Sequence, residues 1–461
     1  MPLPGVDAVI SAIDAVAREA MLFAAVGFLI GGIDDLLVDL VFLWSRLRRW
    51  WQPELQRTPL CNNGRIAIFV AAWDEAQVIG SMLRTALARY TYLDYRIYVG
   101  VYPNDPATLA AVGAVAATDD RVRIVINPLP GATTKADCLN AVWRALLRDE
   151  VEETPVRAVV LHDAEDVVHP DELGVMAAWL VDHQAVQIPV LPLPDPRSPL
   201  IAGHYLDEFA EAHAKNLAVR EALGAALPFA GVGCAIDRAL LGQIAQTRGG
   251  LPFDESSLTE DYELGLTVAA MGGRTKLARA YDRDNTLVAV RAYFPASLHA
   301  AVRQKARWMT GIALAGWDRT GWARGGSMGE HWMRMRDRRA TLAIPVLAIA
   351  YIALLAWGLS LGAHLAIGTP LPTPQGGLAI LLAANLVLLG WRIAMRMRFT
   401  AHAFGLVEAL LSVPRLFVAN LVALLAARRA IVIYLPTLRG KRPVWDKTEH
   451  HFPETRESGA A

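Results

Sequence analysis

The chain has 461 residues, more than one ordinary hydrophobic core accommodates, so we expect two or more domains. Its 45 basic residues balance its 45 acidic residues, which excludes an overall positive field that would recruit nucleic acid. Hydrophobic residues make up 54% of the chain and its mean hydropathy is +0.29, which is high for a soluble protein and predicts membrane-spanning segments. The three cysteines form no CxxC pair, so neither a zinc site nor a disulfide framework is expected, and a reducing compartment fits.

Three apolar segments are long enough to span a bilayer. They are residues 21–44, 341–368 and 376–395, and no AxA-like cleavage site follows the first. Arginines gather after the first segment, before the second and after the third. Because cytoplasmic flanks are rich in lysine and arginine, this pattern places the N-terminus outside and the block between residues 50 and 335 in the cytoplasm.

Acidic residues interrupt the first of these segments at Asp34, Asp35 and Asp39. Charged side chains within a membrane segment either pair with opposite charges or line a polar path between helices. We expect these three to pair with arginines near the inner surface. The alternative is a polar path, taken for example by a product.

Residues 404–434 form a fourth apolar stretch, which Glu408, Pro414, Arg415 and Asn420 interrupt. A crossing here would leave the basic residues that follow it outside the cell, against the orientation inferred above. We therefore expect two amphipathic helices on the cytoplasmic face of the bilayer, with a fourth crossing as the alternative.

Short β-rich runs alternate with helical stretches between residues 60 and 320. This alternation is typical of the α/β class, in which crossover helices cover a mostly parallel sheet. The expected strands are 65–71, 95–101, 122–127 and 157–162, and the expected helices are 75–89, 107–117 and 135–148. Ligands bind such sheets beyond the carboxyl ends of the strands.

Acidic and aromatic side chains follow three of the expected strands at these ends. They are Trp73, Asp74 and Glu75 after the first strand, Asp105 after the second, and Asp163, Glu165 and Asp166 after the fourth. Carboxylates are the oxygen ligands that a divalent metal prefers, and Lys135 could add a point charge for a phosphate. The alternative for the DAED stretch is a solvated turn. The chain contains no GxxxxGK[ST] loop and no GxGxxG after the first strand, which argues against an ATPase and a dinucleotide-dependent dehydrogenase.

Two later motifs add further chemistry. They are Thr259-Glu260-Asp261 and the Gln304, Arg307 and Trp308 of RQKARW. On a helix Gln304 and Arg307 share a face, the guanidinium can bind a diphosphate with two hydrogen bonds, and the Trp308 ring offers a surface to a sugar. The alternatives are that Thr259 simply caps a helix and that the Arg-Trp pair is an interfacial membrane anchor.

In this order, and with these membrane segments around them, the motifs resemble a family 2 glycosyltransferase of the membrane-embedded, cellulose-synthase-like kind, in its bacteriophage-adsorption protein B branch. The resemblance runs from GGIDDLLVDL through LHDAED to WDKTEHHFP and covers nearly the whole chain. It implies a GT-A, Rossmann-like domain that binds a nucleotide-sugar with Mg²⁺ or Mn²⁺. The residues it implies are metal ligands at Asp163, Glu165 and Asp166; catalytic acids at Asp261, as the base, and Glu260; and donor-binding side chains at Trp73, Asp74, Glu75, Asp105, Lys135, Gln304, Arg307 and Trp308. Because the DxD-like motif has a glutamate as its second acid, either Glu165 or Asp166 could be the second ligand.

The resemblance predicts an inverting glycosyltransferase of the bacterial inner membrane with its catalytic domain in the cytoplasm. The expected donor is a UDP-sugar, the acceptor a growing cell-surface polysaccharide or a glycolipid, and export proteins are candidate partners. The expected domains are residues 1–50, a transmembrane helix; 51–320, the GT-A domain; 321–435, two transmembrane helices with interfacial helices; and 436–461, a tail that gates the site or caps the chain. The alternatives are a membrane scaffold or phage-adsorption component with little catalysis, and an enzyme that adds a single sugar to a lipid carrier.

Overall fold

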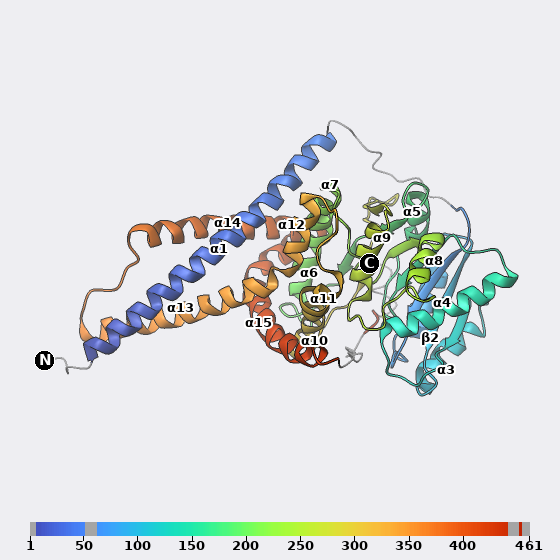
Figure 1. Cartoon of the computed structure of the whole chain (residues 1–461), viewed down its shortest axis with the longest axis horizontal. Coiled ribbons are helices and arrows are strands. Elements are labelled where there is room, and N and C mark those ends of the chain that lie inside the picture. The colour runs from blue at the N-terminus through green and yellow to red at the C-terminus, as the bar shows by residue number, and fades with distance from the viewer. Residues whose placement is uncertain (1–5, 51–61, 441–450, 454–461) are drawn as a thin grey trace.

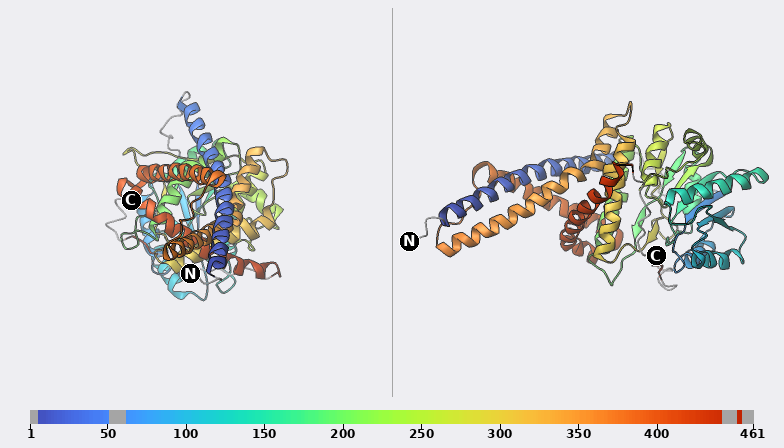
Figure 2. Two further views of the ribbon diagram at one scale, coloured as in Figure 1. Left: turned by 90° about the vertical axis from the view of Figure 1, so that its left-hand side faces the viewer. Right: turned by 60° about the horizontal axis from the view of Figure 1, so that its bottom comes forward.

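The computed structural model describes residues 6–50, 62–440 and 451–453. A sheet domain lies at one end of the molecule and long helices extend from the other (Figures 1 and 2). Shorter helices between the two form an intermediate layer. Its helices are α6 (Gly203–Glu211), η1 (Ala212–Asn216), α7 (Leu217–Ala222), α10 (Leu298–Met309), η2 (Thr310–Leu314), α11 (Ala315–Thr320) and α12 (Met328–Arg338).

The central sheet has seven strands in the order β3-β2-β1-β4-β7-β5-β8. Neighbouring strands are parallel, except that β7 is antiparallel to both β4 and β5. The strands are β1 (Ile66–Ala71), β2 (Tyr95–Val101), β3 (Val122–Ile126), β4 (Ala158–His162), β5 (Ala185–Gln187), β7 (Cys234–Asp237) and β8 (Thr275–Leu277), and β6 (Val190–Pro192) pairs separately with β9 (Val290–Ala292). The predicted α/β class and all four predicted strands are confirmed.

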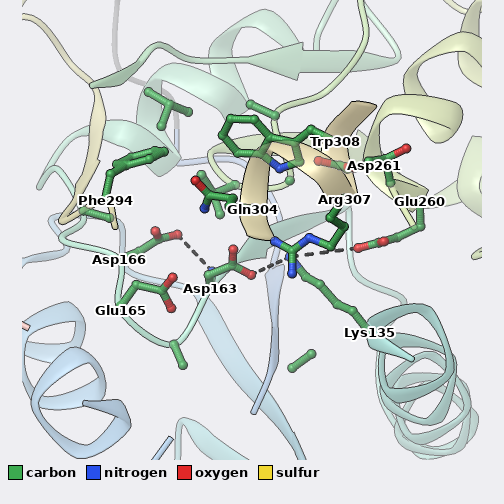
Figure 3. Close-up of a pocket in the computed structure, with 18 of the residues that line it drawn as sticks. Lys135, Asp163, Glu165, Asp166, Glu260, Asp261, Phe294, Gln304, Arg307 and Trp308 are labelled. Atoms are coloured by element: carbon green, nitrogen blue, oxygen red, sulfur yellow. Dashed lines mark hydrogen bonds and ion pairs between the residues drawn. The ribbon is translucent and has the colours of Figure 1, made fainter. Parts of the chain in front are cut away.

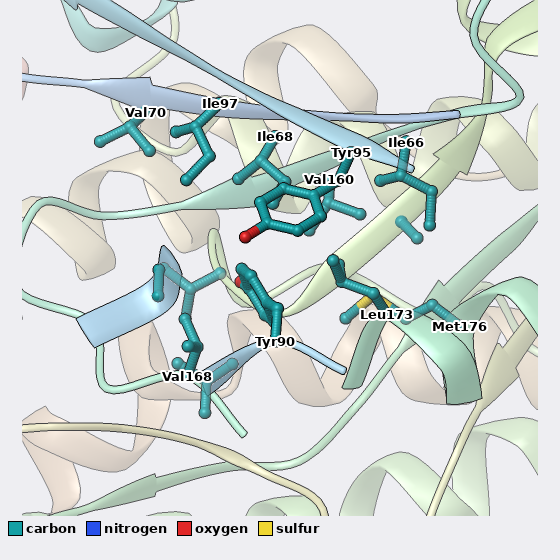
Figure 4. Packing of buried hydrophobic residues seen from close by; sticks show 14 of the residues in the cluster. Ile66, Ile68, Val70, Tyr90, Tyr95, Ile97, Val160, Val168, Leu173 and Met176 are labelled. Atoms are coloured by element: carbon teal, nitrogen blue, oxygen red, sulfur yellow. The ribbon is translucent and has the colours of Figure 1, made fainter. Parts of the chain in front are cut away.

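Helices bury both faces of the sheet, which is why β1, β2 and β4 read as continuous apolar runs. On one face, Ile66, Ile68 and Val70 pack in a cluster with side chains of α2, α3 and α5 (Figure 4). On the other face, Phe69 lies in a cluster with Trp143 of α4 and side chains of α8 and α9. The three predicted helices correspond to α2 (Ile79–Arg89), α3 (Pro106–Ala116) and α4 (Lys135–Glu152), and the other covering helices are α5 (Glu172–Trp179), α8 (Arg238–Thr247) and α9 (Glu260–Ala270).

The strand order reverses between β1 and β4, because the chain passes from β1 outward to β2 and β3 and then returns to the other side of β1. In an open α/β sheet the crevice at such a reversal, beyond the carboxyl ends of the strands, is where ligands bind. The segments that follow Ala71 and His162 both lie there, and they carry two of the acidic strand ends.

Four of the described helices are long and apolar enough to cross a membrane: α1 (Val6–Trp50), α13 (Ala340–Ile367), α14 (Gly376–Phe404) and α15 (Leu406–Thr437). The first three correspond to the predicted spans. A Cβ atom on Gly27 would lie 2.7 Å from the methyl carbons of Val346, and one on Gly32 would lie 2.9 Å from Leu388. These glycines let α1 approach α13 and α14 closely, as small residues do between membrane helices.

The prediction of two amphipathic helices over residues 404–434 is wrong, because one continuous helix, α15, occupies this stretch. Pro414 lies inside the helix and removes one backbone donor. The next side chain, Arg415, is fully buried, donates to the carbonyl of Pro199 at 2.7 Å and pairs with Asp207 of α6. Contacts with distant segments thus hold the helix through the proline.

The rest of α15 also contacts the intermediate layer. The Tyr434 hydroxyl donates to Asp318 of α11 at 2.6 Å, and Ala430 packs with Ala306 of α10. Figure 1 shows α15 close to α6 and α10, whereas α1 and α13 continue away from the sheet domain. This segment is thus a single helix, and its position on the cytoplasmic face of the bilayer stays a prediction.

Acidic residues of α1 connect the long helices to the intermediate layer. Their ion pairs join Asp34 and Asp35 to Arg336 and Arg339, and Asp39 to Lys215. The predicted pairing with arginines is therefore confirmed for the first two acids, whereas the third has a lysine of η1 as its partner.

Most of the predicted tail, 436–461, lies outside the described residues, apart from the end of α15 and residues 451–453. Phe452 packs against the core cluster that contains Ile66 and Ile68. This part of the WDKTEHHFP motif therefore contacts the sheet domain, and its role as a gate or a cap stays a prediction.

Candidate active site

One cleft brings together residues from separate stretches of the chain (Figure 3). It lies beyond the carboxyl ends of β1 and β4, and α10 contributes to its wall. The predicted residues that line it are Glu75, Lys135, Asp163, Glu165, Asp166, Glu260, Asp261, Gln304, Arg307 and Trp308. Trp73, Asp74 and Asp105 are not part of the lining.

The turn after β4 carries the DxD-like motif. Oδ1 of Asp163 lies 2.5 Å from Nζ of Lys135. Oδ2 of Asp166 lies 2.8 Å from Nδ1 of His162 and accepts a hydrogen bond from the backbone N–H of Asp163 at 2.9 Å. One oxygen of Asp166 is therefore used twice within the protein.

His162 lies beneath this turn, between two carboxylates. Its Nε2 is 2.8 Å from Oε1 of Glu172, which also accepts from the Tyr90 hydroxyl at 2.7 Å. Burial alone would lower the pKa of His162, but Glu172 and Asp166 raise that pKa to about 10. The ring is therefore an imidazolium at neutral pH.

Lys135 connects the DxD-like turn to the later acidic motif. It is the first residue of α4, where Thr134 caps the helix by accepting from the N–H of Asp137. Its Nζ lies 4.0 Å from Oε1 of Glu260 in addition to its contact with Asp163. Burial alone would lower the pKa of Lys135, but the surrounding carboxylates raise it above its ordinary value, so the side chain is a fixed cation.

Glu260 and Asp261 open α9 at the opposite side of Lys135 (Figure 3). Thr259 occupies the N-cap position, but its hydroxyl makes no capping hydrogen bond within the described residues. The alternative that Thr259 caps a helix is therefore confirmed for its position but not for a capping hydrogen bond of its side chain, and it leaves the cleft position of Glu260 and Asp261 unexplained. Burial raises the pKa of Glu260 to about 7 and raises the pKa of Asp261 above its ordinary value.

A glycine loop packs directly against Asp261. Gly231 has φ of +81°, and a Cβ atom there would lie 2.7 Å from Oδ2 of Asp261 and 3.7 Å from Nζ of Lys135. Both the backbone conformation and the close carboxylate therefore require glycine at this position.

The RQKARW helix α10 belongs to the intermediate layer and forms the wall of the cleft on that side. Gln304 and Arg307 both line the cleft, as their shared helix face predicts, and Oε1 of Gln304 is buried with no hydrogen-bond partner within the described residues. The ring of Trp308 lies 6.1 Å from the rings of Tyr205 and Phe209. Lys305 Nζ lies 5.0 Å from the centre of the same ring. Trp308 is thus an aromatic wall of the cleft as well as a packed residue.

The first two strand ends lie beside the cleft. Asp74 has φ of +55°, and its N–H donates to Oδ2 of Asp105 at 2.6 Å. The other oxygen of Asp105 caps α3 by accepting from the N–H of Thr108 at 3.2 Å. Trp73 packs edge-on against Tyr102 with ring centres 5.2 Å apart. Asp105 therefore holds the loop that presents Glu75 to the cleft.

The cleft also contains residues that the sequence did not single out. Phe209 and Phe294 line it, and both pack on each other with ring centres 4.7 Å apart. Isolated phenylalanines carry no motif, so their position depends entirely on the fold. The capping role of Asp105 could have been predicted from the sequence, because an aspartate directly before a proline is typical of a helix N-cap.

The donor set fits a divalent metal that is shared with a substrate. Within the described residues no group of three histidine, cysteine or acidic side chains forms a ready metal site. Mg²⁺ is commonly held by one or two carboxylates together with substrate phosphates. Asp163 and Glu165 supply two carboxylates that line the cleft, so the residues present fit such a metal.

Comparisons with known proteins agree with the fold and the motifs. Residues 63–311 match the family model described as glycosyltransferase like family 2. The chain is 34% identical over 458 residues to bacteriophage adsorption protein B of Escherichia coli (strain K12), and equally to bacteriophage N4 adsorption protein B of Escherichia coli O157:H7. These alignments cover 93% of this chain and 61% of each relative, so the chain spans less than two thirds of their length.

A solved structure shares the fold. The mannosyltransferase PcManGT from Pyrobaculum calidifontis, in complex with GDP-Man and Mn²⁺, aligns with a TM-score of 0.50 at 18% identity, over 87% of this chain and 98% of that one. The sheet domain therefore has the GT-A fold. The family match covers more than half of the chain and contains both acidic motifs of the cleft. The chain belongs to the family 2 glycosyltransferases.

Proposed function

We propose that the chain transfers a sugar from a nucleotide-sugar donor to a hydroxyl group of an acceptor, with inversion at the anomeric carbon. One observation carries the proposal: the Lys135 ammonium lies between Asp163 of the first acidic motif and Glu260 of the second. A diphosphate held near the first motif would then lie within reach of a base from the second. A glycosidase also uses two carboxylates, but it needs no basic groups for a nucleotide.

The roles follow from the charge of each group. Asp261 accepts the proton of the acceptor hydroxyl as that oxygen attacks, and Glu260 beside it sets the charge around the base. Lys135 and Arg307 hold the negative charge of the departing diphosphate. Gln304 has a side-chain oxygen with no hydrogen-bond partner among the described residues, and it offers this oxygen to a hydroxyl group of the bound sugar or acceptor. Asp163 and Glu165 would hold Mg²⁺ or Mn²⁺, which neutralises phosphate charge when bound.

The nucleoside belongs beside the first two strand ends, where Trp73, Asp74 and Glu75 follow β1. We propose UDP as the nucleotide. Because the mannosyltransferase with the same fold was solved with GDP-Man and Mn²⁺, the donor assay includes GDP-sugars as well.

We place the enzyme in a bacterial inner membrane with its sheet domain in the cytoplasm, and keep the four-part division at residues 50, 320 and 435. Arg336 near the end of α12 and Arg339 at the start of α13 pair with acids of α1, which supports a common inner boundary for these helices. The acceptor would be a growing cell-surface polysaccharide or a glycolipid. Alkaline phosphatase fused into the loop 368–375 is expected to be active, and an inactive fusion would reverse the orientation.

The transfer assay uses the purified full chain in detergent with Mn²⁺, a panel of UDP- and GDP-sugars, and product sizing. We expect turnover with at least one donor and a ladder of products. A single product size would favour transfer of one sugar to a lipid carrier. Absence of turnover together with absence of nucleotide binding would favour the scaffold alternative.

Replacement of Gly231 by alanine is expected to lower kcat by about 10²-fold, because the added methyl group displaces the Asp261 carboxylate. Nucleotide binding should remain. The matched control is Gly224→Ala, since Gly224 also has positive φ, +64°, but no atom of the described residues lies within 4 Å of an added Cβ. Equal loss of activity in both variants would assign the effect to backbone strain rather than to Asp261.

The rate should fall on the acid side of the pH profile, at a higher pH than an ordinary aspartate would give, because burial raises the pKa of Asp261. The pKa of Glu260 is raised to about 7, and the pKa of Asp261 is also raised, so both acids bind protons as the pH falls. A protonated Asp261 cannot accept the proton of the acceptor hydroxyl. Glu260→Gln removes the negative charge beside Asp261. The pKa of Asp261 should therefore fall, and the acid limb of the kcat/KM profile should move to lower pH. A limb at the same pH in both proteins would show that another group controls it.

A further inference from the structure

A chain of buried polar contacts supports the DxD-like turn from below. It runs from Tyr90 through Glu172 and His162 to Asp166, with successive distances of 2.7, 2.8 and 2.8 Å, and ends on the N–H of Asp163 at 2.9 Å. The side chains of His162 and Glu172 are 0% exposed and that of Asp166 is 3% exposed. The members therefore cannot exchange these partners for water.

The chain of contacts joins three rigid elements to the turn. Tyr90 directly follows α2, Glu172 is the first residue of α5, and His162 is the last residue of β4. Figure 4 shows Tyr90 within the core cluster against Leu173. A carboxylate tied to such elements has a fixed position, unlike one on a free loop.

Asp166 uses this position to fix the backbone of the first acid of the motif. Its Oδ2 forms a hydrogen bond with Nδ1 of His162 and accepts a second one from the N–H of Asp163. This oxygen is therefore engaged within the protein, while the side chain of Asp166 as a whole lines the cleft. Figure 3 shows Asp163, Glu165 and Asp166 around the same turn.

We infer that His162 and Asp166 form a buried clamp that positions the turn carrying Asp163 and Glu165, with His162 as a positioning residue that acts through Oδ2 of Asp166. This inference rests on the proposed function, because it concerns the metal that the cleft would share with a nucleotide. Hydrogen-bond partners behind metal ligands typically change metal affinity by about 10- to 100-fold when they are removed.

The test measures Mn²⁺ binding to the full chain in detergent from the loss of the free-ion EPR signal, with saturating UDP and, in a parallel series, GDP. His162→Gln and Asp166→Asn are each expected to weaken Mn²⁺ binding by about 10- to 100-fold. Asp163→Asn should abolish it. The double variant His162→Gln/Asp166→Asn should bind as weakly as Asp166→Asn alone, because both changes remove the same contact.

Tyr90→Phe is the control for lost stability. It removes a hydroxyl group at the far end of the chain of contacts but leaves His162 against Asp166. We expect its Mn²⁺ affinity to equal that of the wild-type protein even if its melting temperature falls. Weakened binding in Tyr90→Phe as large as that in His162→Gln would overturn the clamp in favour of a general loss of structure.

Kinetics supply a second readout. At saturating Mn²⁺ the kcat of His162→Gln should recover towards the wild-type value, whereas that of Asp163→Asn should not. Unchanged Mn²⁺ binding in His162→Gln would remove the clamp, and this result overturns this inference alone. Failure of the wild-type protein to bind Mn²⁺ with either nucleotide would instead overturn the proposed function, and the clamp with it.

Discussion

Asp261→Asn is expected to lower the transfer rate by about 10³-fold, the typical contribution of a positioned general base. The asparagine keeps the size of the side chain against Gly231 but cannot accept the proton of the acceptor hydroxyl. Nucleotide affinity should change little, because Lys135 and Arg307 remain in place. The measurement is initial-rate transfer with the best donor of the panel, together with calorimetric titration of the free nucleotide.

The matched control is Asp254→Asn. Asp254 lies in the loop before the same helix, accepts from the N–H of Ser256 at 2.9 Å and does not line the cleft. It should retain wild-type activity. If Asp261→Asn kept most of its activity while Asp254→Asn behaved normally, the base would have to be another group, and Glu260 would be the first to test.

Asp163→Asn is expected to lower the rate by about 10²- to 10³-fold, because it removes one of the two carboxylates that face the diphosphate. It also removes the partner of the Lys135 ammonium, whose Nζ lies 2.5 Å from the carboxylate. Unlike Asp261→Asn, this variant should lose the dependence of the rate on Mn²⁺ concentration. The measurement is the transfer rate as a function of Mn²⁺ concentration.

Asp171→Asn supplies the comparison on the same segment. Asp171 follows the turn, accepts a hydrogen bond from the Thr91 hydroxyl at 3.1 Å and lies outside the cleft. It should have normal activity and normal Mn²⁺ dependence. A strong Mn²⁺ dependence that survived in Asp163→Asn would mean that the metal is held elsewhere.

The fold of the sheet domain was largely predictable because its signals are local. Buried parallel strands read as continuous apolar runs such as IAIFVA, and Thr134 and Asp105 cap the helices that follow. The α15 segment was harder, because its polar residues suggested exposure. Arg415 is instead buried against Asp207, which lies far away in the sequence, and no local pattern reveals such a partner.

Most of the candidate site was predictable for the same reason, because its signals are local. The motif residues converge because strand ends of one sheet meet at one edge, and Gln304 and Arg307 share a face through helix spacing. By contrast, the sequence placed Asp166 with the other acids of its turn and could not distinguish it from Glu165. The difference comes from His162 and Glu172, since the second partner of the imidazole is supplied by α5.

Calorimetric titration of the wild-type chain with UDP and with GDP, in Mn²⁺ and then in EDTA, tests most directly whether the cleft acids grip a cation bound to a nucleotide diphosphate. We predict that one of the two nucleotides binds in Mn²⁺ and binds at least about tenfold more weakly in EDTA. The reason is that the ion is held by cleft carboxylates and by phosphate oxygens at the same time, so its removal weakens nucleotide binding. Binding that ignores the metal, or no binding of either nucleotide, would contradict this prediction.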